Sequence, residues 1–114
     1  MAITPKCLIE PTLLTASNTN YYAASKGLTI IDKMTVVNTS TTLFISFTIY
    51  LVPSGTAAAA SHHAIIKSFT LSPNETYECA KAEGHVLNTG DSIHAAAGTT
   101  ANLSFRVSGR EVVV

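Results

Sequence analysis

The side chains best suited to metal binding or acid–base catalysis in this 114-residue chain are its four histidines: His62, His63, His85 and His94. Neighbouring residues of a strand point to opposite faces, so His62 and His63 could share one ion only from a loop just before a strand. Asp91 lies close to His94 in the sequence, but Gly90 and Asp91 together are typical of a tight turn. We therefore interpret Asp91 as a turn residue and expect no metal site.

Sequence patterns that activate a nucleophile or cradle a phosphate are missing. There is no nucleophile elbow, no glycine-rich phosphate loop and no CxxC pair. Cys7 and Cys79 could form one disulfide, but two cysteines without a secretory signal are more often free thiols. We expect no catalytic residue and no bound cofactor, and we expect that the chain is not an enzyme.

The tyrosines offer a different chemistry, because their rings could stack on a sugar: Tyr21, Tyr22, Tyr50 and Tyr77. The chain has no Trp, and tyrosines at strand positions more often pack at the edge of a core with the hydroxyl group reaching water. The first alternative predicts a carbohydrate-binding protein, and the second predicts only a folded β domain.

The element that must position these side chains is the stretch from Leu43 to Val52, LFISFTIYLV. Alternate residues give it one wholly apolar face: Leu43, Ile45, Phe47, Ile49 and Leu51. The other face is mixed: Phe44, Ser46, Thr48, Tyr50 and Val52. We predict a central strand whose apolar face is covered by a second sheet, with Phe47 and Phe105 in the core between the two sheets.

A second long strand is predicted from Leu28 to Asn38, where Asp32 interrupts the apolar alternation. Either both faces of this strand are partly covered, or a bulge near Asp32 and Lys33 shifts the register. The polar gap at 39–42 has the size of a turn and predicts an antiparallel hairpin between the two long strands. Four alanines between Thr56 and Ser61 could form a single helical turn but not a stable helix.

Shorter strands are predicted at 63–71, 76–80 and 92–97, and a last strand at 102–108 is followed by a kink at Gly109. A turn at 98–100 predicts a hairpin before the last strand. Turn signals recur about every 8 to 12 residues, as in an all-β sandwich or barrel. We predict an all-β fold, an antiparallel β-sandwich that is jelly-roll-like with seven to nine strands. Residues 1–12 form an N-terminal arm or edge strand, and residues 13–114 form the single sandwich domain.

Charge is scarce: charged residues are 12% of the chain and the formal net charge is zero, against about 25% charged residues in typical soluble domains. Such a surface lacks the repulsion that keeps copies apart, which favours association with other copies or with a larger surface. The Lys and Arg residues are scattered, which argues against a nucleic-acid partner. No segment approaches the ~18 apolar residues of a membrane span and no signal-peptide pattern is seen, so we expect no membrane association.

Four stretches, taken in order, resemble small bacteriophage virion proteins: IIDKMTVVNTSTTLFISFTIYLVPSG, AIIKSFTLSPNETYE, LNTGDSIHAAA and LSFRVSGREV. Such proteins have four features in a fixed order. A strand ending in Asn comes first, and a long apolar strand ending in a Leu-Val-Pro-Ser-Gly turn follows it. A Leu-Ser-Pro-Asn-Glu-Thr turn and a Gly-Asp-Ser-Ile hairpin come next. The resemblance covers Leu13 to Val113. It implies a structural role, as a capsid decoration or cement subunit or as a neck or tail component, without catalytic residues.

We therefore predict a bacteriophage virion structural protein, made in the host cytoplasm, that binds the major capsid protein or an adjoining neck or tail protein. We also expect it to bind its own copies as a homo-oligomer, a trimer. The proline-bearing segment 1–11 could reach a neighbour as an arm, and a neighbouring subunit could cover the mixed face of the 43–52 strand. These two surfaces supply the predicted interface residues: Cys7, Leu8, Ile9, Phe44, Tyr50 and Val52. The alternative is a carbohydrate- or receptor-binding β-sandwich on a tail appendage, using the tyrosines or the loops near Asn18 and Thr56.

Overall fold

Nine β-strands form two antiparallel sheets in a computed structural model, which describes residues 2–56 and 60–113. The strands are β1 (Ala2–Leu13), β2 (Thr19–Ala23), β3 (Leu28–Asn38), β4 (Ile45–Val52), β5 (Ala64–Leu71), β6 (Thr76–Glu78), β7 (Val86–Leu87), β8 (Ser92–Ala97) and β9 (Leu103–Val113). A single 3-10 turn, η1 (Ser61–His63), precedes β5. Within the described residues no helix is long and apolar enough to cross a membrane.

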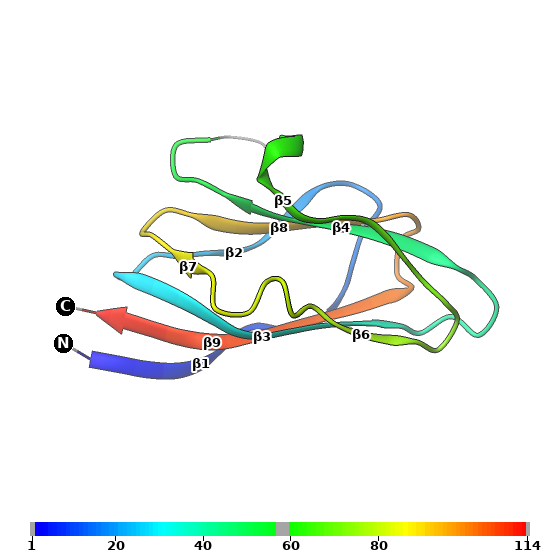
Figure 1. The fold of residues 1–114 in the computed structure, drawn as a ribbon, viewed down its shortest axis with the longest axis horizontal. Coiled ribbons are helices and arrows are strands. Elements are labelled where there is room, and N and C mark those ends of the chain that lie inside the picture. The colour runs from blue at the N-terminus through cyan, green and yellow to red at the C-terminus, as the bar shows by residue number, and fades with distance from the viewer. Residues whose placement is uncertain (1, 57–59, 114) are drawn as a thin grey trace.

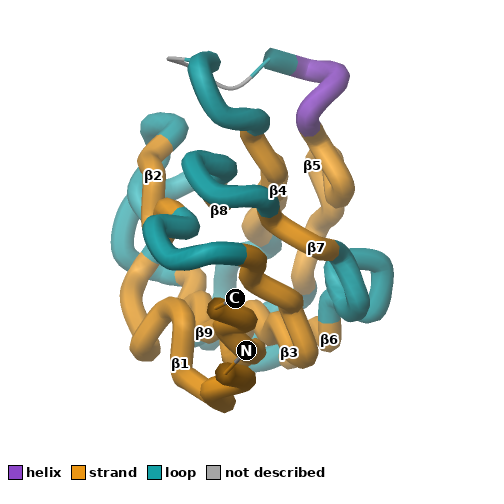
Figure 2. The backbone as a smooth tube through the Cα atoms, turned by 90° about the vertical axis from the view of Figure 1, so that its left-hand side faces the viewer, coloured by secondary structure: helices purple, strands orange, loops and turns teal. Residues whose placement is uncertain are grey.

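The two sheets pack face to face, and most consecutive strands lie in opposite sheets (Figures 1 and 2). One sheet has the order β1-β9-β3-β6, with β7 also paired to β3, and the other has the order β2-β8-β4-β5. Both chain ends lie at the same end of the first sheet (Figure 1). Leaving aside the two-residue β7, each sheet has four strands, and a chain that alternates between two such sheets in this order makes a jelly roll. The predicted antiparallel β-sandwich of jelly-roll type is therefore confirmed.

Two predicted hairpins are wrong, because the strands that they were to join lie in different sheets. β3 pairs with β9, β6 and β7, whereas β4 pairs with β5 and β8, so the loop at 39–44 crosses from sheet to sheet. The loop at 98–102 likewise connects β8 in one sheet to β9 in the other. A turn-sized polar gap is equally compatible with a hairpin and with a crossing, and only the pairing of the flanking strands distinguishes the two.

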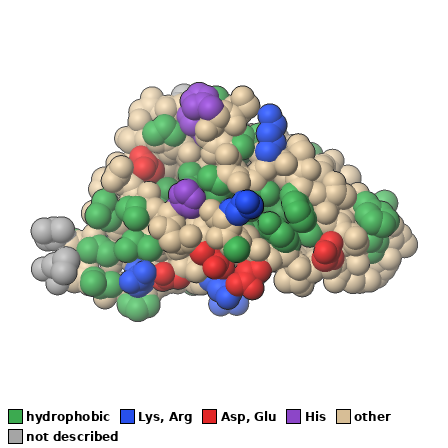
Figure 3. Space-filling model, in the orientation of Figure 1, with side chains coloured by type: hydrophobic (Ala, Val, Ile, Leu, Met, Phe, Trp, Pro, Cys, Tyr) green, Lys and Arg blue, Asp and Glu red, His purple; other side chains and the backbone are tan. Residues whose placement is uncertain are grey.

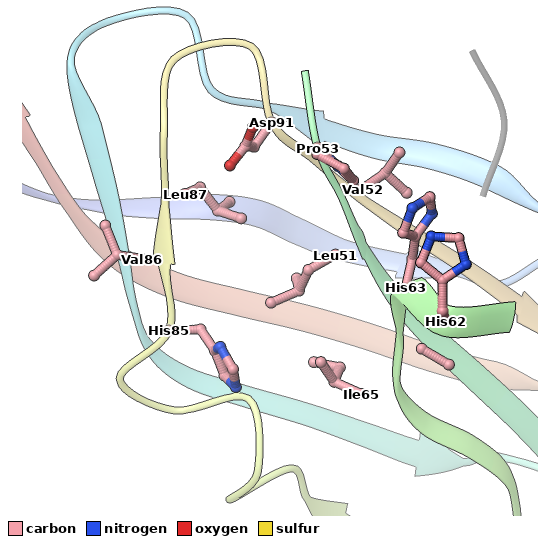
Figure 4. A pocket seen from close by; sticks show the side chains of 11 residues that line it. Leu51, Val52, Pro53, His62, His63, Ile65, His85, Val86, Leu87 and Asp91 are labelled. Atoms are coloured by element: carbon pink, nitrogen blue, oxygen red, sulfur yellow. The ribbon is translucent and has the colours of Figure 1, made fainter. Parts of the chain in front are cut away.

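The core between the sheets contains Phe47 and Phe105, which are 1% and 0% exposed, as predicted. Strand β4 is central in its sheet, flanked by β8 and β5, but it begins only at Ile45, and both residues before it are exposed. The predicted faces of this strand are wrong at its end, where Val52 is 1% exposed and Leu51 is only partly buried. Leu51 and Val52 both line a cleft at this end of the strand (Figure 4).

Of the two alternatives given for Asp32, the bulge is present, since the pairing of β3 with β9 shifts register between Ile31 and Lys33. The predicted kink at Gly109 is wrong, because β9 runs unbroken past it. A Cβ atom at this position would meet the backbone carbonyl of Ile30 and the Leu8 side chain. Glycine is therefore needed where β9 passes closely between its two neighbours.

Smaller differences concern element ends and cysteines. The 63–71 strand begins at Ala64 and the 76–80 strand ends at Glu78. The predicted helical turn over the four alanines falls largely on residues 57–59, which lie outside the described residues. Both Cys7 and Cys79 are free thiols.

Candidate functional site

A cleft of about 360 Å³ lies at one end of the sandwich and brings three of the four histidines together with Asp91 (Figure 4). It is lined by Leu51, Val52, Pro53, His62, His63, Ala64, Ile65, His85, Val86, Leu87 and Asp91. These residues come from the end of β4, from η1 and the start of β5, and from the segment around β7 in the opposite sheet. The cleft therefore depends on the packing of the two sheets and not on any local motif.

Asp91 serves the turn that was predicted for it. Its Oδ1 accepts a hydrogen bond from the backbone N–H of Ser54 at 2.9 Å, and its Oδ2 accepts one from the N–H of Asn88 at 2.9 Å. Gly90 beside it has a φ of 94°, in the left-handed region that favours glycine. The carboxylate therefore joins the turn after β4 to the turn before β8.

His62 and His63 lie together in η1, in the loop position that allows both rings to share one side. Their ring centroids are 4.2 Å apart, and Nδ1 of His63 accepts the backbone N–H of Ala60 at 3.0 Å. His85 lies across the cleft from this pair (Figure 4). Within the residues that the structure describes, no three His, Cys, Asp or Glu side chains are placed to hold a metal ion.

His94 lies outside the cleft, on the outer face of the second sheet, because its neighbours Ile93 and Ala95 point into the core. It is only 9% exposed and pairs across the strands with Asn20 and Tyr50. Burial lowers the pKa of His94, and the nearby His63 lowers it further. His94 therefore loses its proton more readily than a free imidazole does.

Chemically, the cleft offers imidazoles and apolar walls. None of its eleven described lining residues is a Ser, Thr, Cys or Lys, so it lacks a nucleophile for an imidazole to activate. Its one carboxylate already accepts two backbone hydrogen bonds. The arrangement can hold a small group with mixed polarity, and its lining shows no acid–base pair.

The predicted interface residues are placed in two different ways. Leu8, Ile9 and Val52 are 8%, 4% and 1% exposed and belong to the interior of the chain itself. Phe44 is 70% exposed and Tyr50 partly exposed, so these two could meet a partner. Cys7 is partly exposed, and its thiol donates a hydrogen bond to the Ile9 carbonyl at 3.4 Å. The interface role of the six residues stays a prediction. Only Cys7, Phe44 and Tyr50 are exposed enough to contact a partner.

The described part of the proposed arm, residues 2–11, lies within β1, which pairs with β9 along its length. Pro5 lacks an N–H and stands opposite Arg110 in this register. A proline at the outer edge strand of a sheet discourages another strand from adding there. The segment is thus part of the chain's own sheet.

The tyrosines that could stack on a sugar are mostly engaged inside the chain. The Tyr21 hydroxyl accepts the N–H of Thr15 at 3.2 Å, and its ring packs edge-on against Phe105. The Tyr22 hydroxyl donates to Glu111 at 2.9 Å, and burial raises the pKa of Tyr22. This contact ties the two sheets together, and no sequence signal indicated it.

Sequence reasoning also missed a second, smaller groove beside Phe69, Tyr77 and two lysines, Lys67 and Lys81. These residues are dispersed over two strands and a turn, so only the packing of the sheets brings them together. The sequence offered one signal for this groove: an aromatic residue on each of two consecutive predicted strands, Phe69 at 63–71 and Tyr77 at 76–80.

Comparisons with known proteins do not place the chain in a family. No protein-family model and no curated protein matches it. Among solved structures, it is similar to a chain in "Structure of infectious bursal disease virus Gx strain", with a TM-score of 0.44 and 14% sequence identity. The match covers 96% of this chain and 31% of that one, so this chain spans about a third of its length. A similarity this low carries no argument about function.

Proposed function

We propose that the chain is a structural subunit of a bacteriophage particle, one that decorates or cements the capsid by binding the major capsid protein and its own copies. The observation that carries this proposal is the strand order, β1-β9-β3-β6 facing β2-β8-β4-β5. Jelly rolls with this layering are used by viral capsid domains, lectins and cupins. The resemblance of the sequence to small phage virion proteins favours the first of these.

The surface supports a role in assembly. Eight large hydrophobic side chains are at least 38% exposed among the described residues: Ile3, Leu13, Leu28, Leu43, Phe44, Phe69, Val86 and Val113. Singly exposed apolar residues are common, but Ile3, Val112 and Leu28 stand directly opposite one another across β1, β9 and β3. They share the outer face because Thr29, the neighbour of Leu28, is buried in the interior.

Figure 3 shows hydrophobic side chains gathered at the end of the molecule where both chain ends lie. An apolar row across three strands is typical of a surface that another protein covers. With 12% charged residues and zero net charge, little repulsion opposes contact between copies. The same surface argues that the chain works by binding and not by catalysis, and we propose that it is not an enzyme.

The test is the composition of purified particles of the virus that encodes the chain. We expect the chain in many copies per particle and in a fixed ratio to the major capsid protein, with a surface layer missing from particles made without it. A chain found only free in the lysate, and absent from washed particles, would overturn the proposal.

The oligomeric state is tested separately by light scattering of the purified protein. A trimer has three times the 12.0 kDa mass of the chain. Replacing Leu28 with Ser should weaken the oligomer, whereas Leu13→Ser, at an exposed position near the other end of β1, is the matched control. A strictly monomeric species at high concentration would contradict self-association.

A further inference from the structure

A groove of about 260 Å³ opens on the side of the sandwich, between β5 of one sheet and the region of β6 in the other. Its lining is apolar and aromatic except for two lysines: Ile65, Ile66, Lys67, Phe69, Tyr77 and Lys81. On the face drawn in Figure 3, side chains of Lys or Arg stand next to hydrophobic ones in the region between β5 and β6. We call this site the side groove.

The aromatic wall of the side groove is built by a bulge in β5. Phe69 stands opposite Phe47, and Ile66 stands opposite Ile49, so Lys67 and Ser68 together face the single residue Thr48. Ser68 has a φ of 50°, and its N–H donates to Oγ1 of Thr48 at 3.0 Å. The bulge turns Phe69 toward the gap between the sheets.

Phe69 then stacks on Tyr77 from the opposite sheet, with ring centroids 4.2 Å apart and an interplanar angle of 25°. Both rings lie 6.0 Å from the buried ring of Phe47. Phe69 nevertheless stays 38% exposed. The groove thus presents an apolar aromatic surface that is fixed before any ligand arrives, which lowers the entropy lost on binding.

The charge at the rim has no counterpart within the groove. In the described part of the chain the ion pairs are Lys6–Glu111, Lys33–Glu78 and Arg110–Asp32, and none includes Lys67 or Lys81. None of the described residues that line the groove carries a carboxylate. Both lysines are exposed, so their attraction for an anion is modest and is screened by salt, and the apolar wall must supply most of the contact. The complementary ligand is therefore an apolar group with negative charge next to it.

We propose that the side groove docks an extended segment of a partner protein in which an aromatic or large aliphatic side chain is flanked by Asp or Glu. The apolar side chain packs on Phe69 and Tyr77, and the flanking carboxylates meet Lys67 and Lys81. Continuous strand addition along β5 is not part of this mode, because the bulge at Ser68 interrupts the edge.

A second copy of the chain fits the groove less well. Among the described residues the most exposed large apolar side chain is that of Phe44, which has no Asp or Glu within four positions on either side. The proposal rests on the proposed function in one respect, since the partner is then the coat or neck protein of the particle. Its test needs no particle and can succeed or fail independently.

The experiment titrates the full chain with three synthetic peptides of the same length. The first has a central Phe flanked by Asp residues, the second has Asn in place of each Asp, and the third has Lys. Backbone amide NMR shifts report the site, and fluorescence anisotropy of labelled peptide reports the affinity. We expect the acidic peptide to shift amides at 65–69, 77 and 81 and to bind at least tenfold more tightly than the Lys peptide, about 1.4 kcal/mol.

Charge reversal provides the matched variants. The double variant Lys67→Glu/Lys81→Glu should reverse the preference between the acidic and Lys peptides, and Lys26→Glu, at an exposed lysine outside the groove, should leave it unchanged. Added salt should weaken the acidic peptide in the parent protein.

Four results would overturn the proposal. These are equal binding of the acidic and Lys peptides, shifts that map elsewhere, and no binding of any peptide at millimolar concentration. The fourth is loss of a self-association, seen by light scattering, in the Lys67→Glu/Lys81→Glu variant, which would assign the groove to a second copy. If the acidic peptide binds as expected but the chain is absent from particles, the proposed function fails and the docking site stands.

Discussion

Asn38 is the residue whose replacement best tests how the two sheets are joined. It ends β3, is 0% exposed, and precedes the loop that crosses to β4. Its Nδ2 donates to the carbonyl of Leu43 at 2.8 Å and to those of Leu71 and Ser72 at 3.2 Å, while its Oδ1 accepts the N–H of Ser40 at 3.0 Å. One amide therefore connects the end of a strand in the first sheet to the ends of β4 and β5 in the second.

Replacing Asn38 with Ala removes all four contacts. The Leu71 carbonyl lies in a buried residue, whereas Leu43 and Ser72 are exposed and their carbonyls can bind water. A buried polar group left without a partner costs about 1–3 kcal/mol, and each lost hydrogen bond about 0.5–1.5 kcal/mol. We expect Asn38→Ala to lower the free energy of unfolding by about 2–4 kcal/mol. For a chain of this length the unfolding entropy is about 0.24 kcal/mol/K, so Tm should fall by about 8–17 °C.

Differential scanning calorimetry and guanidinium titration measure these quantities, with Asn18→Ala at an exposed position as the control. Asn38→Asp is the sharper variant, because it places a carboxylate against carbonyl oxygens at neutral pH. Its loss should exceed that of Asn38→Ala at pH 7 and diminish in acid, where a protonated carboxyl can donate. A loss below about 1 kcal/mol for Asn38→Ala would refute the role given to this amide.

Three further predictions concern burial. Phe47→Ala should cost about 3–5 kcal/mol in a guanidinium titration, against about 0.5 kcal/mol or less for the 70%-exposed Phe44→Ala, and equal losses would contradict the assigned core. Burial lowers the pKa of His94 in the folded chain, so as the pH falls this imidazole is protonated in the unfolded chain before it is protonated in the folded one. The free energy of unfolding should therefore decrease as pH drops below about 6.5. Urea titrations from pH 7.5 to 5.5 should show this slope, and a slope unchanged in His94→Gln would exclude His94 as its source. Burial raises the pKa of Cys79 to about 12, so a thiol reagent at pH 8 should modify Cys7 first and Cys79 only in denaturant; equally fast modification of both would disagree with the structure.

The sequence alone determined the fold class and the main residues of the core. Alternation in the 43–52 stretch was enough to place Phe47 inside, and the polar Asp32 within an apolar strand reduced the possibilities there to a bulge or two partly covered faces. These features are local, since a strand's period of two residues and the chemistry of turns are set by neighbouring residues. The predicted sandwich of seven to nine strands follows from their repetition.

The tertiary structure alone decided which sheet each strand joins. Asn38 was predicted as an ordinary strand-end residue, but the strands on either side of the loop after it pair in different sheets, so this loop crosses between sheets and does not close a hairpin. Leu8 and Ile9 likewise read as an arm that could reach a neighbour, but pairing of β1 with β9 places them in the chain's own core.

The side groove shows most clearly what the sequence could not predict. Lys67 and Phe69 belong to one sheet, whereas Tyr77 and Lys81 follow the crossing to the other, so no spacing in the sequence brings the four together. A pattern read along the chain reports which face a residue takes within its own strand. The meeting of side chains from opposite sheets depends on strand order, bulges and crossings, and these are fixed by contacts between residues far apart in the sequence.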